Sequence, residues 1–340
     1  MAKKKVEKLL ALAKGKKHAL IMPHDYADPD AIGAALGLKT LLAKKLGIDA
    51  TVSFNGVVGR QENCMLCEYL GLQVFPADGL DYDSYDLIAI VDCQPGTGNN
   101  SLPEERQADI VVDHHPVEGD LEGVKFVDVR LDYGSSSTIL TEYLLDAGVS
   151  ISTELATALL YGIKTDAMNF TRKTKESDIR MYLALFNLID NDALSRIESA
   201  GLPREYFQVL RNAVEDAGTY DDVLVSDLGE LDNPGMIGEL ADLFLRAEGS
   251  GTVLCFGVYD GKLMISIRSL DPKVHAGRII RYAVGRRGTA GGHATMAGGQ
   301  IPLLKDTKKE EEEHRKAVLD RVFSKLSIEG KRKKKITKCT

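Results

Sequence analysis

The sequence of 340 residues contains no tryptophan, and aromatic residues make up only 6% of it. Proteins that bind long single strands of nucleic acid commonly stack successive bases on aromatic side chains. The shortage of aromatic residues therefore disfavours a long base-stacking channel. A basic excess is also absent, since the net charge is −7. A general binder of duplex DNA needs a large basic face, so this class is disfavoured as well.

Cysteines and long apolar runs are scarce too. No apolar run approaches the ~18–20 residues that a membrane-spanning helix needs. The basic N-terminus is not followed by the apolar stretch of a secretory signal. The cysteines are odd in number and widely spaced, which disfavours a disulfide framework: Cys64, Cys67, Cys93, Cys255 and Cys339. We expect a cytoplasmic protein with no membrane partner.

What the first half does contain is an alternation of apolar strands and helical patterns. Ala31–Leu46 has the apolar spacing of a helix. The predicted strands are His18–Met22, Ala50–Phe54, Leu87–Val91 and Ile110–Val112. Strands that alternate with helices indicate a parallel sheet with crossover connections. Residues 135–188 and 190–217 are predicted to be mainly helical.

The second half predicts a smaller α/β domain. A strand-rich block begins near Tyr220, and two alternating runs are joined at Asp260-Gly261, which is typical of a hairpin turn. A helix at about 273–284 and a strand near 295–302 follow. We therefore expect an α/β fold with a catalytic domain at 1–190 and an active site in the cleft between two domains. The other parts are a helical connector at 191–225, a substrate-binding domain at 226–325 and a basic tail at 326–340, with 331–335 as a solvated, mobile end.

Histidine and aspartate residues gather where the predicted strands end. They are His24, Asp28 and Asp30 after the first strand, Asp92 after the third, Asp113-His114-His115 after the fourth, and Asp166 in the helical region. The carboxyl ends of parallel strands meet at one edge of a sheet. Taken singly, Asp28-Pro29-Asp30 is an ordinary capped helix start and Asp92 an ordinary turn residue. Together they favour one site, where divalent cations would offset the repulsion between carboxylates.

The order and spacing of these residues resemble those of the motifs in the DHH phosphoesterases. In the C-terminal half, Arg268-Ser269 and Gly291-Gly292-His293 resemble the DHH-associated nucleic-acid-binding domain. That domain occurs in the subfamily of single-strand exonucleases and nanoRNases. The resemblance covers about residues 16–305.

The resemblance implies a site with two divalent ions, Mn²⁺ or else Mg²⁺. One ion would be held by His24, Asp28 and Asp92, and the other by Asp30, Asp92, His114 and Asp166, with Asp92 bridging. Asp113 would orient the histidines, and His115 would contact the phosphate or assist the leaving group. In the second domain, Arg268, Ser269 and His293 would hold a phosphate or nucleotide, and Gly291 and Gly292 would let the backbone approach it.

The implied activity is hydrolysis of a phosphate ester by metal-activated water. The candidate substrates are nanoRNA, a linear or cyclic dinucleotide and a 3′,5′-bisphosphonucleoside. An inorganic pyrophosphatase or polyphosphatase is an alternative, because a related family shares the ligands of the first domain. A non-catalytic nucleotide sensor is another, although the complete ligand set disfavours it. Exonuclease polarity, monoester phosphatase activity and a homodimer are left open.

Two local features have two interpretations each. Asp25, beside His24, would either repel an anionic substrate or cap a turn. The run from Ser135 to Thr138 is predicted to cap a helix at 137–147, in preference to contacting a phosphate.

Overall fold

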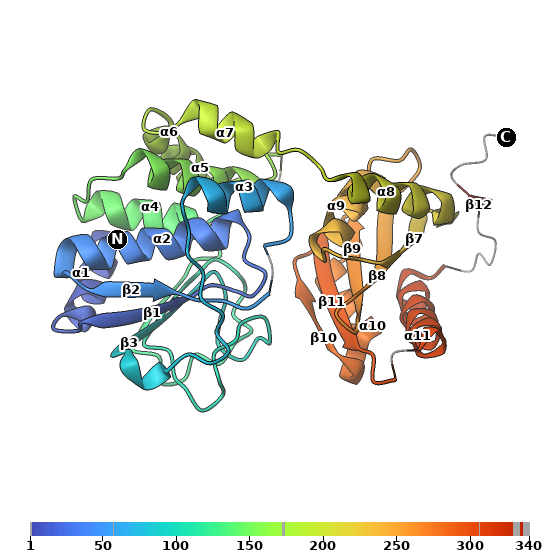
Figure 1. The fold of residues 1–340 in the computed structure, drawn as a ribbon, viewed down its shortest axis with the longest axis horizontal. Helices are drawn as coiled ribbons and strands as arrows, with labels where there is room; N and C mark the ends of the chain where they lie inside the picture. Colours follow the sequence, from blue (N-terminus) through green and yellow to red (C-terminus); the bar gives the residue numbers. More distant parts are fainter. Residues whose placement is uncertain (1, 57, 172–173, 306, 329–333, 336–340) are drawn as a thin grey trace. The chain divides into compact units, whose positions relative to one another are not determined.

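The computed structural model describes residues 2–56, 58–171, 174–305, 307–328 and 334–335. The chain divides into two compact units, Met1–Ala200 and Gly201–Thr340 (Figure 1). Each contains its own sheet and its own hydrophobic core. In the described part of the chain, no helix combines the length and the apolar character needed to cross a membrane.

The first unit is built on a parallel sheet of five strands in the order β2-β1-β3-β4-β5. The strands are β1 (His18–Met22), β2 (Asp49–Val52), β3 (Leu87–Val91), β4 (Ile110–Asp113) and β5 (Phe126–Val129). The predicted bounds of the first and third strands are confirmed. β5 was not predicted, and it forms the edge of the sheet beyond β4.

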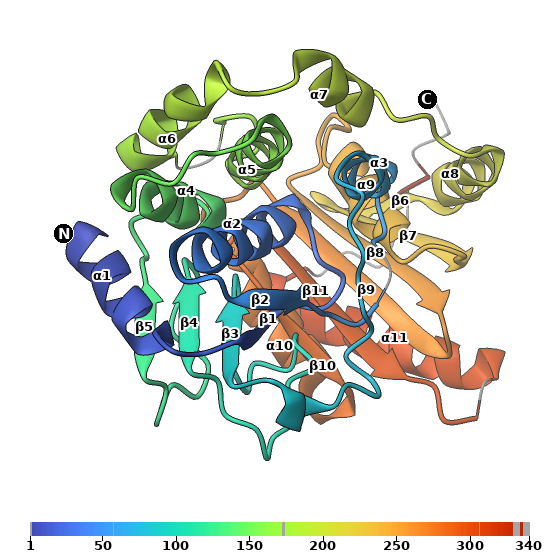
Figure 2. The same ribbon diagram turned by 60° about the vertical axis from the view of Figure 1, so that its left-hand side comes forward.

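Helices cover one face of this sheet, as Figure 2 shows. Ala19 and Ile21 of β1 point toward them, whereas Leu20 and Met22 point to the opposite face. That face is covered by the segments that connect the strands, which include Ala77 and Tyr82. Because both faces are buried, the strands are apolar at successive positions. The unit's helices are α1 (Ala2–Ala13), α2 (Pro29–Leu46), α3 (Gln61–Tyr69), η1 (Tyr82–Ser84), α4 (Ser136–Asp146), α5 (Thr153–Asp166), α6 (Glu176–Phe186) and α7 (Asn191–Glu198).

Glycines allow α2, α4 and α5 to pack closely. A Cβ atom at Gly33 of α2 would lie 2.7 Å from the Ser137 hydroxyl oxygen, and one at Gly162 of α5 would lie 2.6 Å from it. Both distances are shorter than side-chain contacts allow, so a larger residue at either position would push the helices apart. This packing places the start of α4 beside the start of α2, where the predicted site residues lie.

The second unit has a mixed sheet in the order β10-β11-β9-β8-β7-β6-β12. β7 and β8 pair in parallel, and the other described pairs are antiparallel. The strands are β6 (Gly218–Tyr220), β7 (Val223–Glu230), β8 (Thr252–Tyr259), β9 (Lys262–Ser269), β10 (Thr289–Gly292), β11 (Met296–Pro302) and β12 (Lys334–Lys335). The helices α10 (Ala276–Val284) and α11 (Lys308–Leu326) pack on one face of the sheet. The helices α8 (Arg204–Asp216) and α9 (Gly235–Phe244) pack on the other face. The short helix η2 (Gly285–Arg287) follows α10.

The hairpin predicted in this unit is confirmed as β8 and β9. Its turn residues, Asp260 and Gly261, have φ angles of 48° and 66°, as the tight turn between twisted strands requires. The predicted helix at 273–284 begins later, at Ala276, because His275 caps it by accepting a hydrogen bond from the Arg278 backbone N–H. The predicted mobile tail needs a correction for Lys334–Lys335, which pairs with β6; residues 331–333 lie outside the described residues.

Candidate metal centre

The first group of side chains follows β1. Asp28 caps α2, and its carboxylate accepts hydrogen bonds from the backbone N–H groups of Asp30 and Ala31, each at 3.0 Å. The Nδ1 atom of His24 lies 2.8 Å from the carbonyl oxygen of Asp25. The ring is thereby oriented with Nε2 toward Asp28 Oδ1 at 3.7 Å and Asp92 Oδ2 at 3.6 Å.

Asp25, next to His24, joins three loops. Its carboxylate accepts hydrogen bonds from the backbone N–H of Asn55 and from the hydroxyl of Ser101. These bonds tie the loop after β1 to the loops after β2 and β3. The carboxylate of Asp25 therefore links loops that are distant in the sequence, a role that neither of the two interpretations describes.

Asp92 follows β3 and is buried, with a φ angle of +59°. Few residues other than glycine adopt this left-handed conformation, and aspartate and asparagine are among the most tolerant of it. The backbone N–H of Asp92 donates to the carbonyl of Val112 at 2.9 Å, and the Ser136 hydroxyl donates to its Oδ1 at 2.9 Å. Backbone strain of this kind is common where a side chain must be aimed at one point.

Asp113 holds the two histidines that follow β4. Its buried carboxylate accepts hydrogen bonds from the backbone N–H groups of His114 and His115, from His115 Nδ1 at 2.8 Å and from Gln94 Nε2 at 2.7 Å. Burial opposes the charge of Asp113, but these partners outweigh burial and hold its pKa well below the usual range. Asp113 is thus fixed as an anion that orients His115.

Asp30 lies at the start of α2, against the N-terminus of α4. The backbone N–H groups of Ser136 and Ser137 each donate to its carboxylate at 2.7 Å. A helix N-terminus stabilises negative charge, so this carboxylate is bound by the positive end of a helix dipole. The predicted cap by the serine run is confirmed, because the Ser135 hydroxyl accepts a hydrogen bond from the Thr138 N–H. The helix begins at Ser136, one residue before the predicted start at 137.

Asp166 is the last residue of α5 and completes the cluster. Its Oδ2 lies 3.2 Å from His114 Nε2, which is also 3.4 Å from Asp92 Oδ1 and 3.9 Å from Asp30 Oδ2. His115 Nδ1 lies 3.8 Å from Asp92 Oδ1. All eight residues that the sequence predicted from the first unit therefore come together at one edge of the sheet.

Three subsets of these residues have ligand atoms close enough to share a cation. They are His24 with Asp28 and Asp92, Asp30 with His114 and Asp166, and Asp92 with His114 and His115. Asp92 thus belongs to two subsets, one with the imidazole of His24 and the other with those of His114 and His115. Carboxylate and imidazole donors without a thiolate suit Mn²⁺ or Mg²⁺.

The electrostatics of the cluster also call for cations. Burial raises the pKa of Asp166 to about 6 and, with the repulsion of Asp30, raises that of Asp92 well above its usual value. Burial opposes a charge on His24, but Asp28 and Asp92 outweigh it and raise its pKa to about 10. Asp92, Asp166 and His24 therefore each keep a proton to higher pH than an isolated side chain would. Divalent ions would replace those protons.

The second unit contains the remaining predicted residues. Arg268 of β9 is mostly buried, and its Nε donates to Asp242 at 2.5 Å. Ser269 is buried, and its hydroxyl lies 2.8 Å from that of Thr252 and accepts from the Asp271 N–H. Contact between Ser269 and a substrate would require these bonds to be exchanged.

Gly291, Gly292 and His293 lie at and just after the end of β10. Gly292 has a φ of +133°, and a Cβ atom there would lie 2.5 Å from the Cα of Ala297, so the backbone turn requires glycine. The His293 carbonyl accepts from the Gly277 N–H at 2.9 Å. The segment is therefore held against the start of α10. Its contact with a substrate stays a prediction, as does an active site between the domains.

Two supporting residues were missed by sequence reasoning. Ser136 bonds to Asp92, and the amide of Gln94 holds Asp113 while its oxygen accepts from the Glu118 and Gly119 N–H groups. Gln94 lies two residues after Asp92, at a strand end, and that position was the available signal. Ser136 lies 44 residues from Asp92 in the sequence, and no spacing rule links them.

Comparison with known proteins follows the same division of the chain. The DHH family, N-terminal domain, matches residues 18–163, and the DHHA1 domain matches residues 221–326. The uncharacterized protein MJ1633 of Methanocaldococcus jannaschii is 35% identical over 304 residues, which are 88% of this chain and 62% of that protein.

Another relative is the cyclic-di-AMP phosphodiesterase GdpP of Geobacillus thermodenitrificans, which is 29% identical over 309 residues. The match covers 83% of this chain and 44% of GdpP, so the chain spans less than two thirds of either relative. Among solved structures, an exopolyphosphatase-related protein from Bacteroides fragilis superposes with a TM-score of 0.66 at 15% identity, covering 95% of this chain and 97% of that one. This likeness concerns the fold.

Proposed function

Because this chain belongs to the DHH family of metal-dependent phosphoesterases and carries a DHHA1 domain, we propose that it hydrolyses phosphate esters of short oligonucleotides or small nucleotides. The observation that carries the proposal is the position of Asp92. Its Oδ2 faces His24 at 3.6 Å and its Oδ1 faces His114 at 3.4 Å. A carboxylate whose two oxygens face two separate ligand groups is suited to bridge two cations.

Each ligand group has its own set of residues. His24 and Asp28 would hold one ion with Asp92, and Asp30, His114 and Asp166 would hold the other. Bound divalent ions supply an activated water and neutralise charge on the phosphoryl oxygens. Mn²⁺ is the ion that we expect, and Mg²⁺ is the second choice, because the donors combine imidazole with carboxylate.

His115 is the residue suited to touch the substrate. Asp113 bonds to its Nδ1, which leaves Nε2 on the far side of the ring, and the side chain is 31% exposed. Burial opposes a charge on the ring, but the bond to Asp113 outweighs it and raises the pKa of His115. A protonated imidazole there would bind a phosphate oxygen or give a proton to the leaving-group oxygen from Nε2.

A nucleotide substrate is supported by the second domain. The name of GdpP describes action on a cyclic dinucleotide, and the similarity to GdpP covers 83% of this chain and therefore both domains. Arg268, Ser269, Gly291, Gly292 and His293 are the residues that we propose for holding the nucleotide; Ser266 accepts a hydrogen bond from Arg268. A pyrophosphatase would need no such domain for a base or sugar.

The test is metal-dependent turnover of a panel of compounds by the full chain with Mn²⁺. The panel contains a 5′-phosphorylated dinucleotide, a five-nucleotide RNA, a cyclic dinucleotide, a 3′,5′-bisphosphonucleoside and pyrophosphate. We expect turnover of at least one nucleotide and its loss in EDTA. Turnover of pyrophosphate alone would replace the proposal with a pyrophosphatase, and tight nucleotide binding without turnover would replace it with a sensor.

A further inference from the structure

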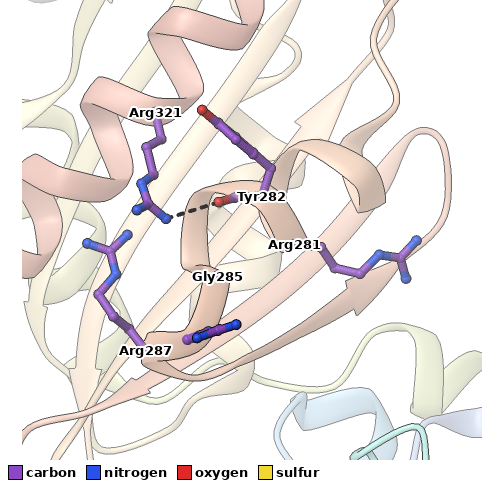
Figure 3. A pocket seen from close by; sticks show the side chains of 6 residues that line it. Arg281, Tyr282, Gly285, Arg287 and Arg321 are labelled. Carbon is purple, nitrogen blue, oxygen red and sulfur yellow. Dashed lines mark hydrogen bonds between the residues drawn. The ribbon is translucent and has the colours of Figure 1, made fainter.

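A hollow of about 470 Å³ opens on the second unit where α10 ends (Figure 3). Its lining residues are Arg281, Tyr282, Gly285, Arg286, Arg287 and Arg321. Four of these six residues are arginines, in a chain whose net charge is −7. We call this hollow the arginine pocket.

The end of α10 fixes two of these guanidinium groups in place. Arg287 donates from Nε to the Val284 carbonyl at 3.2 Å and from a terminal nitrogen to the Ala283 carbonyl at 2.5 Å, so it caps the helix. Arg321 of α11 donates to the Tyr282 carbonyl at 3.3 Å. A Cβ atom at Gly285 would lie 2.8 Å from this Arg321 nitrogen. Glycine therefore lets Arg321 come close.

Three arginines of the pocket differ from Arg268 and Arg315 of the same unit in having no acidic partner among the described residues. Among the residues that the structure describes, no ion pair joins an acidic side chain to Arg286, Arg287 or Arg321. Elsewhere in the unit Arg268 pairs with Asp242, and Arg315 pairs with Asp227. Burial and the nearby charge of Arg321 lower the pKa of Arg287. An anion in the pocket would relieve this repulsion, and phosphate matches the planar donors of arginine.

An aromatic ring stands beside the cations. Tyr282 is 47% exposed, and its ring centroid lies 4.5 Å from Lys325 Nζ and 5.9 Å from the Arg321 guanidinium carbon. Binding sites for single-stranded nucleic acid combine a face on which a base stacks with cations that contact the backbone. The arginine pocket has both in one place.

The pocket is separate from the segment that contains Gly291, Gly292 and His293. That segment is bonded to the start of α10 through Gly277, whereas the pocket lies at the end of α10. A helix rises about 1.5 Å per residue, so the nine residues of α10 separate the two places by roughly 13 Å. Successive phosphates of a stacked strand lie about 3.4 Å apart along its axis, so about four nucleotides span this distance, whereas a dinucleotide is too short.

We propose that the arginine pocket binds a backbone phosphate of a single-stranded oligonucleotide and so favours substrates of several nucleotides over dinucleotides. The inference rests on the proposed function and narrows its substrate class. Arg286 and Arg321 are exposed, so both can be neutralised without disturbing the core. Arg287 is left unchanged because it caps α10.

The experiment compares the Arg286→Gln/Arg321→Gln variant with the wild type and with an Arg211→Gln/Arg246→Gln control. The control removes two exposed arginines from the same unit. With Mn²⁺, we expect kcat/KM for a five-nucleotide RNA to fall about tenfold in the pocket variant, because arginines that bind phosphate are removed, while kcat/KM for a dinucleotide stays the same. In EDTA, the slope of log affinity for this RNA against log salt should become shallower by about 0.7 for each phosphate that the variant no longer binds.

Either of two outcomes would overturn the inference. In the first, the pocket variant keeps the wild-type kcat/KM for both substrates, and its salt slope is also unchanged. In the second, kcat/KM falls equally for both substrates. The pocket would then bind a phosphate that both substrates contain, and it would not distinguish long from short oligonucleotides. Failure of the proposed function looks different, since the wild type itself would hydrolyse neither nucleotide. The salt slope measured in EDTA would still test the pocket in that case.

Discussion

The two units concentrate opposite charges in opposite surroundings. In the first unit, Asp30, Asp92 and Asp113 are buried at the edge of a sheet. Asp30 and Asp113 each accept several hydrogen bonds, and Asp92 accepts one from the Ser136 hydroxyl. In the second unit, Arg286 and Arg321 are exposed at the end of a helix. Buried charges need partners fixed in position, whereas exposed guanidinium groups are stabilised by water. The difference indicates that a single substitution in the acidic cluster disturbs the geometry of the whole site. A substitution in the arginine pocket removes only the contacts of the residue that is replaced.

The largest effect is expected from Asp92→Asn, which keeps a residue tolerant of positive φ and removes the bridging charge. Losing about 4 kcal/mol of transition-state stabilisation would lower kcat by roughly 10³-fold. Steady-state turnover with Mn²⁺ measures this, and circular dichroism checks that the fold is kept. Activity within tenfold of the wild type would contradict a two-ion site bridged by Asp92.

Gly162→Ala tests whether close helix packing sets the geometry of the acidic cluster. The added methyl group would lie 2.6 Å from the Ser137 hydroxyl oxygen and 2.9 Å from the Pro29 carbonyl oxygen. We expect a loss of about 1–3 kcal/mol in the free energy of unfolding, measured with urea. The matched control in the second unit is Gly298→Ala, whose methyl group would meet nothing nearer than 3.7 Å. Equal losses in the two variants would contradict the packing explanation.

Gln94→Ala removes the amide that holds Asp113. Residues that orient metal ligands typically contribute 10–100-fold to metal affinity or activity, so a loss of that size is expected in the Mn²⁺ concentration needed for half-maximal turnover or in kcat. Gln107→Ala is the control, because Gln107 is on the surface and bonds only to the Glu122 carbonyl among its described partners. A Gln94 variant indistinguishable from this control would show that the histidines keep their orientation without the amide.

The smallest effect concerns pH. Burial raises the pKa of Asp166 to about 6, so this carboxyl must release a proton before it binds a cation. Release of this proton should therefore raise the apparent affinity for Mn²⁺ about tenfold between pH 5 and pH 7, in addition to the rise that comes from the proton on His24, as isothermal titration would show. Oligonucleotide binding by the arginine pocket should change little over this range, because guanidinium groups stay charged. A flat Mn²⁺ affinity would exclude Asp166 from the ligands.

The sequence predicted the parts of this molecule that depend on local patterns. The bounds of β1 and β3, the Asp28 cap and the turn at Asp260 follow from runs of apolar residues and from turn chemistry. The clustering of the histidines and aspartates followed from the rule that parallel strands end at one edge. These features require no knowledge of which helix packs on which.

The features that were not predicted depend on tertiary packing. β5 contains Asp128 and an exposed Val127, so it lacks the continuous apolar run that identified β3 and β4. The serine run was expected to cap α4, and it does, but its backbone N–H groups also hold Asp30, 106 and 107 residues away in the sequence. That interaction exists only because glycines bring the helices together.

The left-handed backbone at Asp92 limits how this site can change over evolutionary time. Most substitutions there would strain the chain as well as remove the charge, so they would affect folding and chemistry at once. Asparagine and glycine are the replacements that the backbone accepts without such a conflict. Descendants of this protein that kept the fold but abandoned hydrolysis would be expected to carry one of these two residues at position 92, which makes that single position a diagnostic marker for lost activity.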